Sequence, residues 1–171
     1  MHSSQEKNYH FGQIILHWLI AVLVFYQYVS SNGFSDDKLN KCKNSELASV
    51  ECDFFASHYQ VGLFIFGLMI LRIGMRLYFG APVLSNKVPS IIKLLGKISH
   101  LALYLLVIAM PITGLLGWYV NSGIVLSIHK GLSNVLLSLI LIHICAVGFH
   151  EGVLGSSLIQ RMVTFNPKLK K

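Results

Sequence analysis

The stretch IHKGLSNVLLSLILIHICAVGFH occupies residues 128–150. It ends at His150 and holds two further histidines, His129 and His143, in a largely apolar setting. From residue 131 to residue 150 it contains no Lys, Arg, Asp or Glu, and a helix needs about 20 such residues to cross a bilayer. A separation of 14 residues places the two imidazoles about 40° apart around a helix axis and about 21 Å apart along it. The stretch therefore predicts a membrane helix that presents one histidine towards each end of one face.

The whole chain has the composition of a membrane protein. Its 171 residues are 54% apolar and 12% charged, whereas soluble domains carry about 25% charged residues. The net charge of +7 comes from short basic clusters between apolar runs, a pattern typical of orientation signals in membrane proteins. We therefore expect contact with membrane lipid and no nucleic-acid partner.

Four apolar segments are long enough to span a bilayer, and they predict a single domain over residues 1–171. The uncharged runs cover residues 8–35, 54–71, 98–129 and 131–150. Asn121-Ser122-Gly123 is a turn signal that divides the third run. We expect helices at about 11–30, 55–79, 96–120 and 127–151. The predicted fold class is an all-α, four-transmembrane-helix bundle.

Lys and Arg are distributed unequally between the two ends of this bundle. Ten lie in the N-terminal segment, the 72–97 connection and the C-terminal tail, and four lie in the 31–53 loop and at Lys130. Cytoplasmic segments carry the basic excess, so we expect both termini in the cytoplasm and the 31–53 loop outside. Cys42 and Cys52 lie in that loop, where an oxidising compartment permits a disulfide but two free thiols remain an alternative.

Four histidines fall at two depths of the predicted bundle. His17 and His143 each lie about two turns from the cytoplasmic end of the first and fourth helices, whereas His58 and His129 lie near the outer ends of the second and fourth. Paired imidazoles on neighbouring helices can hold haem axially in a bundle. We predict two haems b per chain, held by His17/His143 and by His58/His129. Hydrogen-bonded structural histidines are one alternative, and His10 with His150, nearer the cytoplasm on the same faces, could form a rival pair.

Other polar side chains are candidates for contacts with the haem propionates, which need cations or hydrogen-bond donors. The inner-side candidates are Gln13, Arg72, Arg76 and Lys97, and the outer-side candidate is Lys130. The basic ones could equally anchor their helices among lipid headgroups. His100, near the inner end of the third helix, is a candidate for binding a propionate or a quinone.

Short motifs accompany these histidines along the chain. They are Ile15-Leu16-His17-Trp18, His58-Tyr59-Gln60-Val61-Gly62-Leu63, Leu71-Arg72-Ile73-Gly74-Met75-Arg76-Leu77, His100-Leu101-Ala102-Leu103-Tyr104-Leu105-Leu106, Met110-Pro111-Ile112-Thr113-Gly114 and the His129–His143 spacing with His150 beyond. With them the chain resembles, over almost its whole length, the bacterial cytochrome b561 family of four-helix dihaem membrane proteins. The resemblance implies the same two haem pairs, a multi-pass protein of the bacterial inner membrane, and quinone-linked electron transfer. In one branch of the family it implies oxidation of superoxide with reduction of ubiquinone.

These observations lead to a hypothesis of function with two alternatives. The chain is expected to be an oxidoreductase, a dihaem cytochrome b that links an outer-side donor or acceptor to quinone, with superoxide:ubiquinone oxidoreductase as the most concrete reaction. The 31–53 loop carries five acidic against three basic residues, which weakens attraction of the superoxide anion, although Lys130 could still draw an anion locally. The acidic loop could equally dock a basic periplasmic redox partner. The alternatives are a haem-bearing anchor subunit of a larger dehydrogenase or hydrogenase, and a histidine-based metal-ion transporter.

Overall fold

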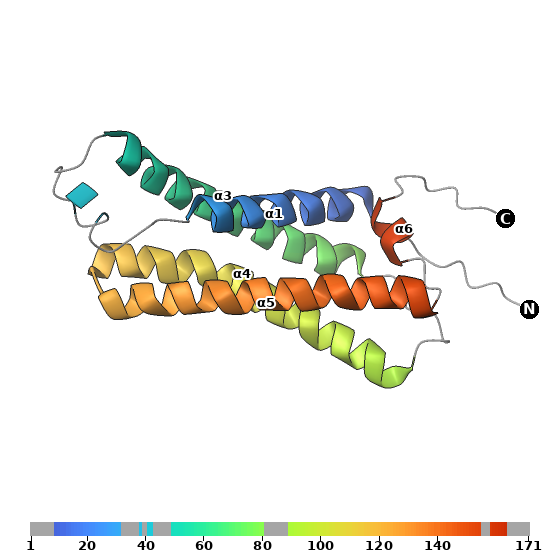
Figure 1. Cartoon of the computed structure of the whole chain (residues 1–171). Coiled ribbons are helices and arrows are strands. Elements are labelled where there is room, and N and C mark those ends of the chain that lie inside the picture. Colours follow the sequence, from blue (N-terminus) through green and yellow to red (C-terminus); the bar gives the residue numbers. More distant parts are fainter. Residues whose placement is uncertain are drawn as a thin grey trace, which may run out of the picture.

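The computed structural model describes residues 9–31, 38, 41–42, 49–80, 89–154 and 158–163. These residues form α1 (Phe11–Ser30), α3 (Ser49–Phe79), α4 (Ser90–Val120), α5 (Gly123–Leu154) and the short α6 (Leu158–Val163). The four long helices alternate in direction, and α1 packs on α3, α3 on α4, and α4 on α5 (Figure 1). No strand occurs in this part of the chain, so the predicted all-α four-helix class is confirmed.

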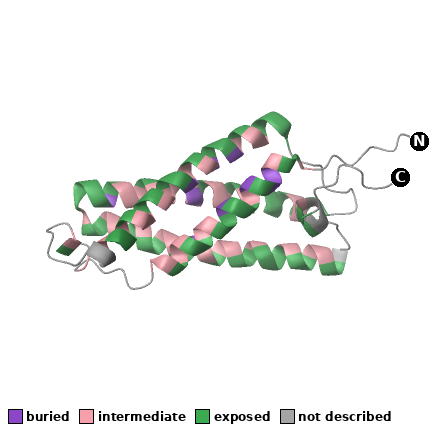
Figure 2. Ribbon diagram, turned by 90° about the horizontal axis from the view of Figure 1, so that it is seen from above, coloured by how far each residue is buried: buried purple, intermediate pink, exposed green. Residues whose placement is uncertain are grey.

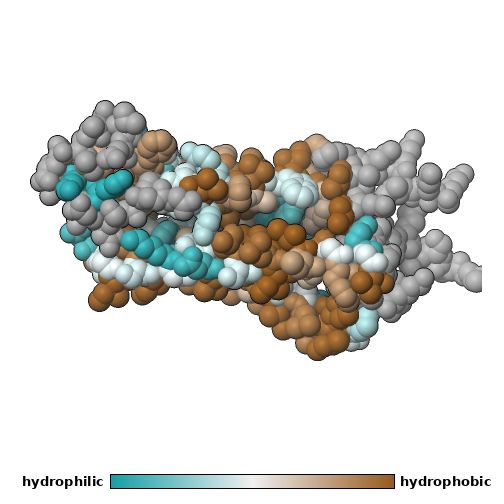
Figure 3. Space-filling model, viewed as in Figure 1, coloured by the Kyte–Doolittle hydropathy of each residue, from teal (hydrophilic) through white to brown (hydrophobic). Residues whose placement is uncertain are grey.

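Each of the four long helices is long and apolar enough to cross a membrane. Exposed positions run along every helix, and buried positions are confined to a few places where helices meet (Figure 2). Hydrophobic side chains cover much of the visible surface between the two ends of the bundle (Figure 3). Because these apolar side chains face outward, their natural surroundings are lipid tails, and the chain is a multi-pass membrane protein.

The first helix has the predicted bounds, whereas the other three are longer than predicted. α3 begins at Ser49 instead of near residue 55, α4 begins at Ser90 instead of 96, and α5 covers Gly123–Leu154 instead of 127–151. The predicted bounds followed the uncharged runs, but charged residues such as Asp53 and Lys93 interrupt a run without ending the helix. Asn121 adopts a left-handed conformation with φ of 53°, which ends α4, and α5 starts two residues later.

A small apolar cluster fills the centre of the bundle. Its buried members are Ile20 from α1, Ile65 and Met69 from α3, Val107 from α4 and Leu136 from α5. Leu136 lies midway between His129 and His143 in the sequence, so this layer is about 10 Å from each of them along α5. The two histidine levels are therefore separated by apolar side chains that come from all four long helices.

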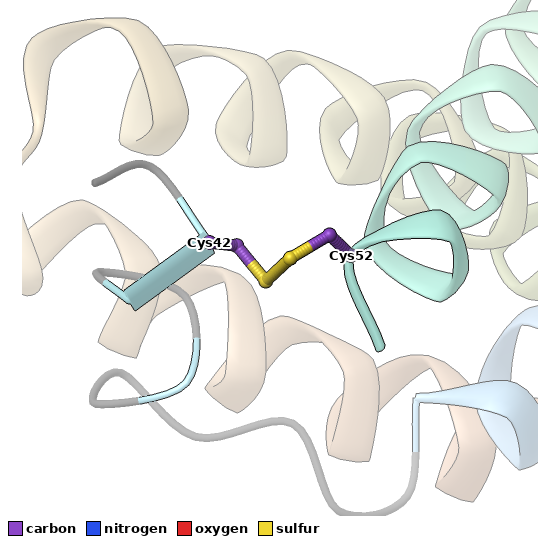
Figure 4. Close-up of a disulfide and its surroundings, with 2 residues drawn as sticks. All are labelled: Cys42 and Cys52. Carbon is purple, nitrogen blue, oxygen red and sulfur yellow. A yellow bond between two sulfur atoms is a disulfide. The ribbon is translucent and has the colours of Figure 1, made fainter. Parts of the chain in front are cut away.

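Cys42 and Cys52 form a disulfide, with their Cα atoms 5.5 Å apart (Figure 4). The sequence left open whether these thiols are bridged, and the structure contains the bridge. It joins the loop that follows α1 to the first turn of α3. A disulfide persists in an oxidising compartment, which agrees with the outward position expected for this loop.

Candidate functional site

His58 on α3 and His129 on α5 face each other at the end of the bundle where α3 and α5 begin. Their ring centroids are 6.3 Å apart, and their planes are inclined by 82°. Two imidazoles that share one metal ion through bonds of about 2 Å place their centroids roughly 6 Å apart. The separation of these rings therefore suits axial binding of one iron ion between them.

A cavity of about 760 Å³ lies against this pair, and both histidines line it. Its walls come from all four long helices and are mostly apolar, with Leu63, Val107 and Leu137 among them. Cofactor sites are typically concave, apolar spaces of about 300–1,000 Å³ with a few placed polar groups. The size and lining of this cavity fit a flat macrocycle such as haem.

Backbone and side-chain acceptors fix the ring of His129. Its Nδ1 lies 3.0 Å from the carbonyl oxygen of Met110 and 3.1 Å from Oγ1 of Thr113. A carbonyl oxygen only accepts, so Nδ1 must carry the proton and donate it. The Thr113 hydroxyl donates to Ala109 O or Met110 O, which leaves an oxygen lone pair for His129. In the neutral ring, Nε2 of His129 therefore carries the free lone pair, and this nitrogen can bind a metal ion.

Gly114 gives the His129 ring access to these acceptors. A Cβ atom at this position would lie 3.1 Å from Cε1 of His129, so a larger residue would press on the ring. The Met110–Gly114 motif on α4 thus supports an imidazole that α5 supplies. The sequence singled out this motif but did not reveal which side chain it serves.

Gln27 on α1 supports α3 next to His58. Its Nε2 donates to the carbonyl oxygen of His58 at 2.7 Å, and Gly62 leaves room because a Cβ there would lie 3.3 Å from that nitrogen. Oε1 of Gln27 is buried and has no hydrogen-bond partner in the described part of the chain. Sequence reasoning missed Gln27 and the role of Thr113; the available signal was a polar side chain inside an uncharged membrane segment.

The inner level gathers side chains from all four long helices around Arg72. This arginine is 8% exposed, and its Nη1 donates to the carbonyl oxygen of Gln13 at 2.9 Å. Its Nη2 lies 3.2 Å from Nδ1 of His17, and its guanidinium lies 5.9 Å from the centre of the Tyr104 ring. Arg72 is thus enclosed by the bundle instead of extended along its surface as a headgroup anchor.

His143 lies in the same inner group, beside the ring of His100. The two ring centroids are 5.0 Å apart. Both rings are close enough to His17 to interact with it electrostatically. The structure therefore brings together His17, Arg72, His100 and His143, all of which the sequence assigned to the inner level.

The remaining predicted residues flank the two histidine levels or hold the helices together. Lys97 is exposed on α4, one turn before His100, and Lys130 is exposed but lines the outer cavity. Gln13, at 6% exposure, donates from Nε2 to the carbonyl oxygens of Met75 and Gly80. Its amide thus ties the start of α1 to the end of α3. Arg76 lies 6.0 Å from the centre of the Tyr9 ring.

The fold and these intramembrane side chains define a helical, multi-pass membrane protein with candidate cofactor sites at two depths. Residues 8–165 match the family model of prokaryotic cytochrome b561, and the chain belongs to this family. It is therefore a membrane electron-transfer protein that binds haem b.

Two curated relatives match nearly the full length of the chain. It is 31% identical over 160 residues to cytochrome b562 of Cereibacter sphaeroides. This alignment covers 94% of the chain and 98% of that protein. The chain is also 26% identical over 181 residues to a Yersinia pestis protein named "Probable superoxide oxidase CybB". This alignment covers 92% of the chain and 97% of that protein.

Proposed function

We propose that the chain is a dihaem cytochrome b that carries electrons across the bacterial inner membrane between an outer-side donor and membrane quinone. The observation that carries this proposal is the His58/His129 pair, whose rings are 6.3 Å apart beside a cavity of about 760 Å³. When bound, each haem supplies one-electron redox chemistry. The protein residues hold, orient and shield these groups.

At the outer level, His58 and His129 would hold the haem. The acceptors at Met110 and Thr113 hold the His129 ring with Nε2 as its free base. The apolar cavity wall excludes water, which limits side reactions of a redox centre. Lys130 lines the same cavity and remains exposed, so it is the proposed cationic partner of a propionate.

At the inner level, His17 and His143 are the proposed ligands, and Arg72 is the proposed propionate partner. Arg72 donates to Nδ1 of His17. If His17 held a haem through Nε2, its Nδ1 would carry the proton, and either the guanidinium or the imidazole ring would have to turn to separate the two donors. A carboxylate nearby would give Arg72 a charge-assisted hydrogen bond in exchange.

Quinone is proposed to react near the inner group. His100 lies beside His143 and can donate or accept a hydrogen bond through its ring, which is what a quinone carbonyl or a quinol hydroxyl requires. Lys97, one turn away at the surface, would support an anionic group at that end.

The proposed orientation has both termini in the cytoplasm. The ten-to-four distribution of Lys and Arg supports it, and so does the disulfide at the opposite end of the bundle. The His58/His129 level then faces the periplasm.

Superoxide is the proposed outer-side donor, because a relative over nearly the full length is named as a superoxide oxidase. Stopped-flow mixing of the purified protein with superoxide tests this reaction, with added superoxide dismutase as the control. We expect reduction of the bound haem that the dismutase abolishes, followed by reoxidation with ubiquinone. Haem that stays oxidised with superoxide but is reduced by dithionite would exclude superoxide as the donor. A protein that copurifies in equal amount would favour the anchor-subunit alternative.

A further inference from the structure

The short helix α6 (Leu158–Val163) lies at the end of the bundle where α1 begins and α5 ends (Figure 1). It has six residues, and helices shorter than about 12 residues are marginal on their own in water, so contacts with the rest of the chain must stabilise it. We infer that α6 is a strap that joins α1 to α5 beside the inner site, and that Trp18 is the positioning residue through which it acts on His17. The inference rests on the proposed function, because it takes His17 and His143 as ligands of the inner haem.

One end of α6 is held by α5. The backbone N–H of Ile159 donates to Oε2 of Glu151, in the last turn of α5, at 3.1 Å. The first four N–H groups of a helix have no partner within that helix, and this carboxylate satisfies one of them. The short helix thus folds back on α5 and packs on it.

The other end of α6 is held by α1. The indole Nε1 of Trp18 donates to the carbonyl oxygen of Met162 at 2.8 Å, across 144 positions of the chain. Met162 is the fifth of the six residues of α6, so its carbonyl is one of the last four, which have no partner within the helix. Tryptophan near the end of a membrane helix commonly directs its N–H to the headgroup region. Trp18 is 48% exposed and yet donates to α6, which therefore contacts α1 as well as α5.

The strap matters because α1 and α5 carry the proposed inner ligands. α1 packs mainly on α3, and α5 packs mainly on α4, so the packing of the long helices couples His17 to His143 indirectly. Trp18 follows His17 directly, and the centroids of their rings are 5.5 Å apart. Ligands have to be held to within about 0.5 Å of their working geometry. A connection from Trp18 through α6 to α5 limits relative movement of the two ligand-bearing helices.

Haem transfer to apomyoglobin tests this inference in chains that carry one haem. The His129→Ala background is expected to hold the inner haem, and the His143→Ala background the outer one. Trp18→Phe keeps an aromatic ring and removes the donor. We expect it to release the inner haem about five- to tenfold faster, the factor that corresponds to one hydrogen bond, with no change at the outer haem. Tyr26→Phe, which removes a hydroxyl from an exposed ring of α1, is the matched control and should change neither rate.

Substitutions of Glu151 test the other end of the strap. Glu151→Ala removes the acceptor for Ile159 and should also speed release of the inner haem. Glu151→Gln keeps a side-chain oxygen that can accept, and should retain the inner haem as the parent does. Hydrogen–deuterium exchange of residues 158–163 measures the docking of α6 without any haem signal. We expect faster exchange in Trp18→Phe and in Glu151→Ala.

Electron paramagnetic resonance separates positioning from a general loss of stability. We expect the low-spin signal of the inner haem to shift in Trp18→Phe at equal haem content, because the ring of His17 changes its orientation. A general loss of stability would release both haems faster and leave the signal of the bound fraction unchanged, and that result would overturn the inference.

The remaining outcomes separate this inference from the proposed function. If the wild type holds no inner haem, the proposed function fails. If it holds one, and α6 exchanges faster in Trp18→Phe while the release rate and the resonance signal of the inner haem keep their parent values, the inference alone fails. Unchanged exchange of α6 in both Trp18→Phe and Glu151→Ala would also overturn it. If Trp18→Phe does not fold, the two Glu151 variants decide the question by the same measurements.

Discussion

The imidazole planes of His58 and His129 are nearly perpendicular, at 82°, while their centroids are 6.3 Å apart. Perpendicular axial imidazoles leave two iron d orbitals close in energy, which makes the low-spin ferric state strongly anisotropic. We therefore expect electron paramagnetic resonance of the oxidised protein to show a strongly axial low-spin signal from the outer haem. This signal should vanish in His129→Ala. A rhombic signal from both haems would mean that the rings do not keep this arrangement.

Removing a proposed ligand should remove one haem and leave the other. We expect His58→Ala and His129→Ala each to lower the haem content from two per chain to one, because the outer haem would lose one of its two protein ligands while the inner pair stays intact. Haem and protein quantitation on the purified variants measures this change.

His10→Asn is the matched control for the ligand variants. His10 caps α1 by accepting from the backbone of Gly12, and asparagine preserves that role. Its haem content should stay at two per chain. Loss of a haem from His10→Asn with none lost from His17→Ala would reassign the inner ligand.

Gly114→Ala should weaken the outer site through the His129 ring. The added Cβ would lie 3.1 Å from Cε1 of His129, and overpacking of this kind costs about 1–3 kcal/mol. We expect weaker retention of the outer haem in a haem-transfer assay. Gly67→Ala, on α3, has nothing within 4 Å of the added carbon and should retain both haems. Equal retention by the two variants would contradict the role assigned to Gly114.

The disulfide should stabilise the outer end of the bundle. Its cysteines are ten residues apart, and closing a loop of this size contributes about 2–3 kcal/mol in the chain-entropy account. The double variant Cys42→Ser/Cys52→Ser is therefore expected to have a lower Tm in a thermal unfolding assay. Cys145→Ser, which replaces an exposed free thiol, should leave the Tm unchanged. A double variant as stable as the wild type would show that the bridge adds little.

The fold class could be predicted from the sequence because a segment in lipid must satisfy its backbone hydrogen bonds internally, which a helix does. The uncharged runs of membrane length therefore predicted all four long helices. The helix starts at Ser49 and Ser90 could not be predicted from the uncharged runs, because charged side chains such as Asp53 and Lys93 interrupt those runs while the helices continue through them.

The sequence predicted at which depth of the bundle the candidate-site histidines lie, but not their contacts with neighbouring helices. Position along a helix assigned His58 and His129 to one level, and the structure places their rings 6.3 Å apart. The contacts of Thr113 and Gln27 depend on how neighbouring helices are rotated about their axes, which spacing along one helix does not determine. The burial of Arg72 could not be predicted from the sequence either. A basic residue near the end of a membrane span usually extends to the lipid headgroups, and the enclosure of Arg72 depends on how the neighbouring helices pack around it.

We propose that His58/His129 and His17/His143 each hold one haem b, and a pyridine haemochrome assay with protein quantitation measures the number bound. We expect two haems b per chain in the purified, folded protein. A folded preparation with one haem or none per chain would contradict this proposal.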